Sequence, residues 1–232
     1  MTPIQTRLHQ THQRIFQAAC RAGRRPARLL VITKARPAHM VKEAWEAGHK
    51  AFGEGYVLEG LHKIQQLSCL PDLEWHFTGK LQSNKTRLVA QNFDWMHSLD
   101  QIKTAHRLNS QRSSSLAPLN LCLQVNIDNQ PTKSGVHPSE VISLAQQLIT
   151  LPALKLRGLM AIPAPQDDPE QQRPAFRAMR SLFDDLHAQF PEQQLDTLSM
   201  GMSADMEVAI EEGATLVRIG TAIMGAPEVP PG

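Results

Sequence analysis

Short runs of apolar and β-branched residues alternate with longer amphipathic stretches along nearly the whole chain, and this alternation constrains the fold more than any other feature. Residues 29–33 (LLVIT) have the length and branching of a buried strand, whereas residues 4–22 have the apolar spacing of a helix. A repeated strand–helix alternation is typical of parallel strands covered by helices. The sequence therefore predicts an α/β protein.

The strand candidates form one block, with no second cluster of strands. They cover residues 29–33, 50–53, 74–78, 94–98, 119–127, 154–161, 197–200 and 216–219. The helical stretches cover residues 4–22, 38–47, 56–66, 85–91, 101–109, 139–148, 174–190 and 205–211. An eightfold alternation favours a closed barrel over an open, doubly wound sheet. We expect residues 1–232 to form one domain, a (β/α)8 TIM-type barrel with an additional N-terminal helix.

Composition narrows the classes of partner. Lys and Arg number 24 against 22 Asp and Glu, a formal charge of +2 that predicts no broad attraction to nucleic acid or anionic lipid. The cysteines, Cys20, Cys69 and Cys122, are odd in number and widely spaced, which favours reduced thiols over a disulfide framework or a zinc site. No apolar run approaches the ~18 residues of a membrane span, and no signal peptide is recognisable. We expect a soluble, cytoplasmic protein without a metal.

Lys34 is the first candidate for a functional role. The active face of a parallel barrel lies at the carboxyl ends of its strands, and Lys34 directly follows the strand at residues 29–33. A lysine at a strand end can simply extend its amine to water. A desolvated lysine can instead act as a nucleophile and form a Schiff base. The position alone leaves both interpretations open.

Two glycine-containing segments follow the last two strands. They are M-G-M-S-A-D at residues 200–205 and V-R-I-G-T-A at residues 217–222. Gly201, Ser203, Gly220 and Thr221 let backbone N–H groups, hydroxyls and helix starts meet a phosphate, and the loops after strands seven and eight are the usual phosphate site of such barrels. The alternative is ordinary turn chemistry, with Ser203 capping the helix that starts at residue 205. The pair of segments favours a phosphate site.

Arg218 lies in the eighth strand, two residues before Gly220, so its side chain is expected to point into the barrel. A buried arginine needs a partner there. One candidate is a structural salt bridge to Glu54, and the other is the ring nitrogen of an aromatic cofactor. His76, between two aromatic residues, is predicted to be a hydrogen-bonded core histidine.

Three further lysines lie near the expected rim. Lys80 and Lys85 flank the end of the third strand and the start of a helix, and Lys133 follows the fifth strand. They could bind an anion or could be solvated surface lysines, and the sequence does not distinguish these alternatives.

Seven segments, in order and spread over nearly the whole chain, resemble those of the pyridoxal phosphate homeostasis proteins of the YggS/PROSC type, whose barrel is similar to the N-terminal domain of alanine racemase. They are V-I-T-K-A-R-P at residues 31–37, A-F-G-E-G-Y-V-L-E-G at 51–60, H-F-T-G-K-L-Q-S-N-K at 76–85, K-S-G at 133–135, R-G-L-M-A-I-P at 157–163, M-G-M-S-A-D at 200–205 and V-R-I-G-T-A-I-M-G at 217–225.

The resemblance implies a role for each candidate residue. Lys34 would carry pyridoxal 5′-phosphate through a Schiff base. Ser203, Gly220 and Thr221 would bind the phosphate, and Arg218 would face the pyridine nitrogen. Such a protein would be a carrier or regulator of intracellular pyridoxal phosphate that supplies it to apo-enzymes, and it is expected to be a monomer without catalytic residues.

The sequence departs from the family pattern at two positions. Gly55 stands where an asparagine is usual, and Lys80 stands where proline is frequent.

The alternative function is a weak amino-acid racemase. A two-base racemase of the resembled type needs a tyrosine supplied by a second, β-rich domain of a partner subunit. The sole tyrosine here is Tyr56, and the sequence ends at Gly232 soon after the eighth strand, so we expect racemisation to be weak or absent.

Overall fold

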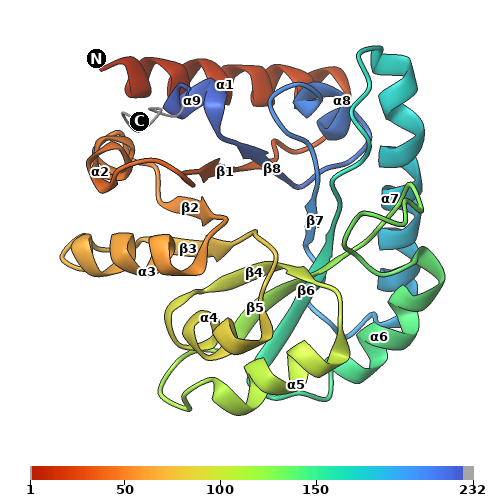
Figure 1. The fold of residues 1–232 in the computed structure, drawn as a ribbon. Helices are drawn as coiled ribbons and strands as arrows, with labels where there is room; N and C mark the ends of the chain where they lie inside the picture. The colour runs from red at the N-terminus through yellow and green to blue at the C-terminus, as the bar shows by residue number, and fades with distance from the viewer. Residues whose placement is uncertain (1, 227–232) are drawn as a thin grey trace.

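Eight parallel strands close into a barrel in the computed structural model, which describes residues 2–226 (Figure 1). Each strand pairs with the next in sequence, and β8 pairs with β1. The strands are β1 Arg28–Ile32, β2 Ala51–Glu54, β3 Glu74–Phe77, β4 Trp95–Leu99, β5 Leu119–Gln124, β6 Leu154–Met160, β7 Thr197–Ser199 and β8 Leu216–Ile219. The predicted TIM-type (β/α)8 fold is therefore confirmed.

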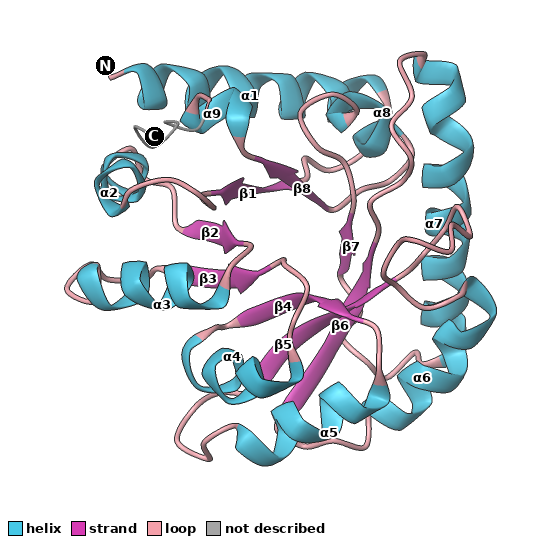
Figure 2. Ribbon diagram, in the orientation of Figure 1, coloured by secondary structure: helices cyan, strands magenta, loops and turns pink. Residues whose placement is uncertain are grey.

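Helices surround the barrel on the outside (Figure 2). They are α1 Pro3–Arg21, α2 Ala38–Glu46, α3 Val57–Gln66, α4 Thr86–Asn92, α5 Ile102–Gln111, α6 Val141–Leu148, α7 Pro169–Gln189, α8 Met206–Glu211 and α9 Thr221–Met224, with 3₁₀ turns η1 Ser83–Lys85 and η2 Pro138–Glu140. The additional N-terminal helix is α1, which begins with a capping box between Thr2 and Gln5 and lies against α2, α8 and α9. Among the described residues, no helix is long and apolar enough to cross a bilayer.

Alternate residues of β1 face opposite sides of the barrel wall. Leu29 and Val31 pack into the main core beneath the helices, whereas Leu30 packs inside the barrel with Ala51 and Leu216. Leu30 is also the register partner of Arg218 on β8. This alternation places Arg218 in the barrel interior, as the sequence predicts.

Several element bounds differ from the prediction. The most marked difference is α7, which begins at Pro169 although we expected a loop up to residue 170 and a helix from residue 174. The Asp168 side chain accepts a hydrogen bond from the Glu170 N–H, and Pro169 occupies the first helical turn, where a missing N–H costs nothing. Pro174 consequently lies inside the helix. The fifth strand also ends earlier than expected, at Gln124.

Candidate functional site

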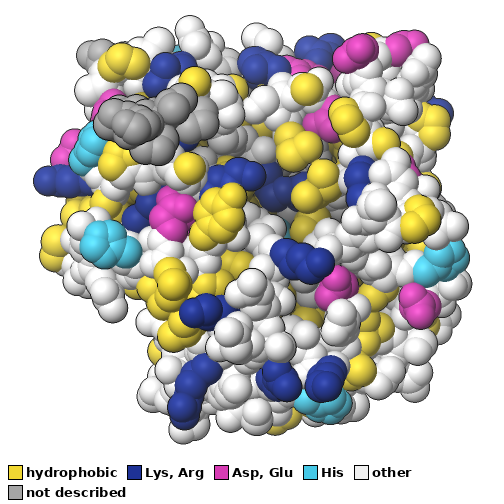
Figure 3. Space-filling view, in the orientation of Figure 1, with side chains coloured by type: hydrophobic (Ala, Val, Ile, Leu, Met, Phe, Trp, Pro, Cys, Tyr) yellow, Lys and Arg dark blue, Asp and Glu magenta, His cyan; other side chains and the backbone are white. Residues whose placement is uncertain are grey.

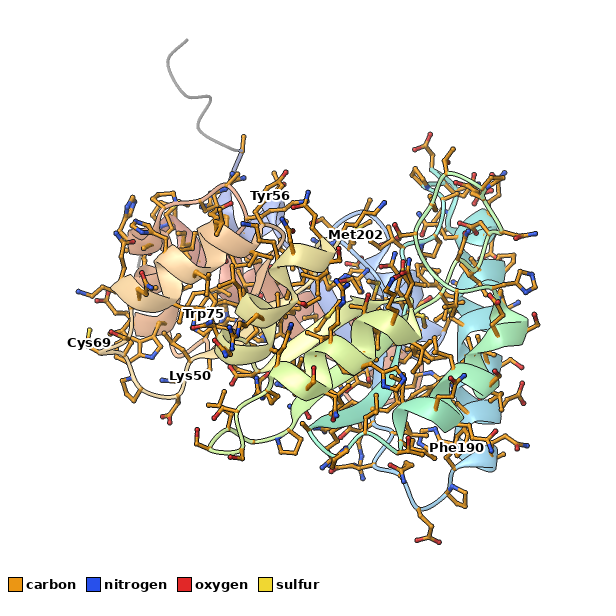
Figure 4. All side chains as sticks on the ribbon, turned by 60° about the horizontal axis from the view of Figure 1, so that its bottom comes forward. Lys50, Tyr56, Cys69, Trp75, Phe190 and Met202 are labelled. Carbon is orange, nitrogen blue, oxygen red and sulfur yellow. The ribbon has the colours of Figure 1, made fainter. Side chains whose placement is uncertain are left out.

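A cavity of about 360 Å³ lies at the carboxyl ends of the strands and contains all five of the predicted site residues. They are Lys34, Ser203, Arg218, Gly220 and Thr221. The sequence analysis missed the other lining residues, which are Ile32, Thr78, Ile162, Met202 and Ala204. Figure 3 looks onto this face, where Lys, Arg and hydrophobic side chains surround a central hollow. Met202 and Tyr56 lie at this end of the molecule, opposite Lys50 and Phe190 (Figure 4).

Lys34 stands at the start of a tightly fixed turn between β1 and α2. The next residue, Ala35, has a φ of 54°, in the left-handed region that side chains other than glycine rarely occupy. Its N–H donates to Glu59 Oε1 at 2.7 Å, and Arg36 donates from Nη2 to the Gly225 carbonyl at 2.6 Å. Within the described residues, the Lys34 amine itself has neither a hydrogen-bond partner nor an ion-pair partner. The backbone is therefore held by hydrogen bonds on the carboxyl side of Lys34, while its amine has no protein partner among the described residues.

A buried ionic network supports the same turn from below. Lys63 Nζ donates to Glu54 Oε1 at 2.6 Å and to the Thr33 carbonyl at 2.5 Å, and the Thr33 hydroxyl also donates to Glu54. Burial raises the pKa of Glu54, although the charge of Lys63 opposes this shift. Glu54 therefore pairs with Lys63, and its predicted alternative role as the salt-bridge partner of Arg218 is wrong.

Arg218 is instead held by neutral oxygen atoms. Nη1 donates to the Ser199 carbonyl at 2.8 Å and to the Ser199 hydroxyl at 2.7 Å, and Nη2 donates to the Ala161 carbonyl at 2.9 Å. A guanidinium has five N–H groups, so two remain, one on Nη2 and one on Nε. Burial lowers the pKa of Arg218 to about 10, which keeps it charged at neutral pH. The arginine brings a positive charge and free donors to the cavity.

The two glycine-containing loops supply neutral donors. Among the described residues, the N–H groups of Ser203, Ala204 and Thr221 donate to no protein oxygen, and the hydroxyls of Ser203 and Thr221 are unpaired. Ser203 does not cap the following helix. Asp205 occupies the cap position of α8, and its carboxylate accepts from the Met202 N–H at 2.6 Å. The helices that follow these loops, α8 and α9, have only six and four residues. The site therefore rests on the hydroxyls and N–H groups of the loops, without the contribution of helix dipoles that the sequence analysis expected.

Lys80 and Lys85 line a second cavity, of about 640 Å³, beside the first. Gly55 also lines this cavity, and a β-carbon at Gly55 would lie 3.1 Å from Cδ of Lys34. The glycine thus leaves space beside Lys34 where a side chain would contact it. Tyr56 is 62% exposed on the same rim and does not line the first cavity.

Lys133 is separate from both cavities. It donates to the Ile162 carbonyl at 3.3 Å and lies 3.7 Å from Asp128. These contacts agree with a lysine that fastens the loop after β5 to the loop after β6.

Comparison with known proteins places the chain in a family. The family described as "Alanine racemase, N-terminal domain" matches residues 8–228. A pyridoxal phosphate homeostasis protein of Haemophilus influenzae is 51% identical over 227 residues, which cover 96% of this chain and 95% of that protein. The chain belongs to the pyridoxal phosphate homeostasis protein family. The family resemblance that the seven sequence segments indicated is thus confirmed.

Solved structures agree with this assignment. PipY of Synechococcus elongatus, determined with pyridoxal phosphate bound, is 37% identical with a TM-score of 0.82, and the match covers 96% of this chain and 100% of PipY. Alanine racemase of Corynebacterium glutamicum matches with a TM-score of 0.68 at 17% identity, over 95% of this chain and 59% of the racemase. The second likeness concerns the fold alone.

Proposed function

We propose that this protein binds pyridoxal 5′-phosphate at the carboxyl face of the barrel and serves pyridoxal phosphate homeostasis as a carrier or regulator. The observation that carries the proposal is the unpaired amine of Lys34 in one cavity with the two donor loops and Arg218. The relatives' shared name and the ligand in PipY support the same function.

The residues of the cavity fit this cofactor. Pyridoxal phosphate supplies an aldehyde that an amine can capture reversibly. Lys34 would hold the cofactor, because a primary amine can bind that aldehyde covalently. Ser203, Gly220 and Thr221 bind the phosphate through hydroxyls and backbone N–H groups, which are the donors that the fold leaves unpaired. Ile32 and Ile162 give the cavity an apolar wall against which an aromatic ring could pack.

We further propose that the protein is not an enzyme. Among the residues that line the cavity, only Lys34 and Arg218 are ionisable, so no second base stands opposite the lysine. Arg218 offers N–H donors only and keeps its charge, so beside the ring nitrogen of a bound cofactor it would keep that nitrogen unprotonated. An unprotonated ring withdraws electrons poorly, which suits storage better than the removal of an α-proton.

We also propose that residues 1–232 form a single cofactor-binding domain, which acts as a monomer in the cytoplasm and delivers pyridoxal phosphate to apo-enzymes. The free thiols of Cys20, Cys69 and Cys122 support a reducing compartment. The balanced charge of the chain supports the absence of nucleic-acid and membrane partners.

A transfer experiment tests the carrier function. Protein loaded with pyridoxal phosphate and freed of excess ligand is mixed with the apo-form of a pyridoxal phosphate enzyme, and recovery of that enzyme's activity is followed. We expect recovery with the wild type and none with Lys34→Ala carried through the same loading.

A racemisation assay tests the absence of enzymatic activity. Incubation of the loaded protein with single enantiomers of alanine and serine should leave them unchanged. Racemisation at about 1 per second or faster would contradict the proposal.

A further inference from the structure

A series of buried polar side chains runs through the barrel interior from the amino-terminal end to the cofactor cavity. It consists of Glu74, His76, His97, Ser199 and Arg218, which we call the interior relay. Glu74 is the first residue of β3 and is partly exposed, whereas His76, His97 and Ser199 are fully buried. The bonded distances are 2.6 Å from Glu74 Oε1 to His76 Nε2, 2.8 Å from His76 Nδ1 to His97 Nε2, 2.9 Å from His97 Nδ1 to Ser199 Oγ, and 2.7 Å from Ser199 Oγ to Arg218 Nη1.

The direction of every bond in the relay follows from its acidic end. Burial would raise the pKa of Glu74, but the hydrogen bond from His76 and the charge and hydrogen bond of Arg28, at 2.7 Å, lower it, so Glu74 is an ionised acceptor. His76 therefore carries its proton on Nε2. Burial lowers the pKa of both histidines, so each is neutral with one N–H.

The proton positions in the hydrogen bonds nearer the cavity follow in the same way. Nδ1 of neutral His76 accepts from Nε2–H of His97, and Nδ1 of neutral His97 then accepts from the Ser199 hydroxyl. The serine oxygen is left with its lone pairs for Arg218. All the protons in the relay point toward Glu74. Within the described part of the chain, no buried side-chain donor or acceptor of Glu74, His76, His97 or Ser199 lacks a partner, and the only spare donors of the relay are the two N–H groups of Arg218. Satisfied networks of this kind fix side chains in one arrangement.

We propose that His76 and His97 are positioning residues for the cofactor, and that they act through Ser199 to aim the free N–H groups of Arg218 at the ring nitrogen of bound pyridoxal phosphate. The inference rests on the proposed function. Without His97, the serine hydroxyl proton loses its acceptor, and the oxygen no longer presents its lone pairs to Arg218 alone. Since neither histidine lines the cavity, both reach the cofactor only through this arginine.

The test compares pyridoxal phosphate with the analogue whose ring nitrogen is replaced by carbon. Both ligands keep the aldehyde for Lys34 and the phosphate for the loops, but only the first accepts a hydrogen bond from Arg218. We expect His97→Phe and Ser199→Ala to weaken pyridoxal phosphate by roughly fivefold to tenfold, as for the loss of one buried hydrogen bond, while affinity for the analogue stays unchanged. The double variant should bind pyridoxal phosphate no more weakly than Ser199→Ala.

Cys122→Ala is the matched control, because Cys122 is a buried strand residue of the barrel that makes no hydrogen bond in the relay. It should leave both affinities unchanged. Equal losses for both ligands in His97→Phe, or no loss for either, would overturn the inference. Failure of borohydride to attach the cofactor to Lys34 in the wild type would instead refute the proposed function.

A second measurement needs no variant. In the wild-type protein with ¹⁵N-labelled histidine, the nitrogen resonances of His76 and His97 should show both rings neutral and protonated on Nε2 at pH 7, and the His97 resonances should shift when pyridoxal phosphate is added. A proton on Nδ1 of His97, a charged ring, or resonances indifferent to the ligand would overturn the relay.

Discussion

At the scale of single residues, the proposed function gives capture of the cofactor and control of its ring to different side chains. Lys34 and Arg218 line the same cavity, and we propose that the first binds the aldehyde while the second faces the ring nitrogen. Ser203 and Thr221 add neutral hydroxyls that have no partner among the described residues. Substitution of the hydroxyls should therefore change the affinity for the phosphate, whereas substitution of Arg218 should change the electronic properties of the ring.

Removing both loop hydroxyls, with Ser203→Ala and Thr221→Ala together, should weaken pyridoxal phosphate much more than pyridoxal, which has no phosphate. Each hydrogen bond to a charged group contributes roughly 1.5–3 kcal/mol, so the double variant should lose at least tenfold in affinity for the phosphorylated ligand. Absorbance titration with the two ligands measures the difference. An equal loss for both would show that the substitutions disturbed the barrel rather than a phosphate site.

Replacing Arg218 with glutamate should let the ring nitrogen of the cofactor take up a proton. The ring then withdraws electrons more strongly, so Arg218→Glu, when loaded, should exchange the α-hydrogen of a bound amino acid with heavy water faster than the wild type. Proton NMR of the amino acid follows the exchange. Arg218→Lys retains the positive charge and should remain as slow as the wild type. An unchanged rate in a folded, loaded glutamate variant would refute this explanation of catalytic silence.

At the scale of elements, the position of Lys34 depends on how β2 and α3 support the turn after β1. The Thr33 hydroxyl donates to Glu54, and Lys63 donates to the Thr33 carbonyl. The N–H of Ala35 donates to Glu59. The backbone on both sides of Lys34 is thus fixed by residues of the next strand and helix.

Lys63→Met should destabilise the protein by about 3–5 kcal/mol, because it leaves the carboxylate of Glu54 buried without a cation. Urea unfolding measures the loss. Lys42→Met is the matched control, since Lys42 is exposed and lies 3.9 Å from Glu46, so that the change should stay within about 0.5 kcal/mol. Similar losses in the two variants would contradict a special role for the buried network.

Sequence periodicity was sufficient for the barrel but not for this network. Strands such as β1 and β8 are short runs dominated by branched apolar residues, and the segments at residues 200–205 and 217–222 each carry a glycine within two residues of a hydroxyl side chain, so their positions follow from local pattern. The partner of Glu54 is a lysine on the following helix that is buried rather than solvated, and lysine on an amphipathic helix is ordinarily exposed. The relay was missed for another reason. His76 was predicted as a hydrogen-bonded core histidine and Arg218 as an inward-facing side chain, but their connection runs through His97 and Ser199, which are 102 residues apart in sequence.

The start of α7 shows a different limit. Acidic residues and prolines at residues 164–170 are typical of a loop, yet an aspartate followed by proline is also a helix start. Both interpretations fit residues 164–170, and the hydrogen bond from the Glu170 N–H to the Asp168 carboxylate shows that the helix begins there.

At the scale of the whole molecule, burial of neutral histidines makes stability depend on pH. Burial lowers the pKa of His49 from 6.5 to about 4, and its Nε2 lies 2.8 Å from the Ala51 carbonyl. Burial also lowers the pKa values of His76 and His97. In the unfolded chain these groups take up protons at higher pH than in the folded protein, so acid favours unfolding.

The free energy of unfolding should therefore be highest above pH 7 and should fall as the pH drops through 6.5. His49 alone accounts for about 2 kcal/mol of that fall by pH 5, and its share stops increasing below pH 4, where the folded protein also takes up the proton. Urea unfolding at several pH values measures the slope. His49→Gln retains a donor for the Ala51 carbonyl and should flatten the slope; an equally steep fall in this variant would contradict the assignment.

The central claim, that Lys34 holds pyridoxal phosphate in this barrel, is tested most directly by borohydride reduction of the loaded protein followed by peptide mapping. Reduction makes the link between amine and cofactor permanent, so its position can be read by mass spectrometry. The account predicts the pyridoxyl group on the peptide that contains Lys34, and no such group in Lys34→Ala. A pyridoxyl group found instead on Lys80, Lys85 or Lys133, or an unmodified protein, would contradict it.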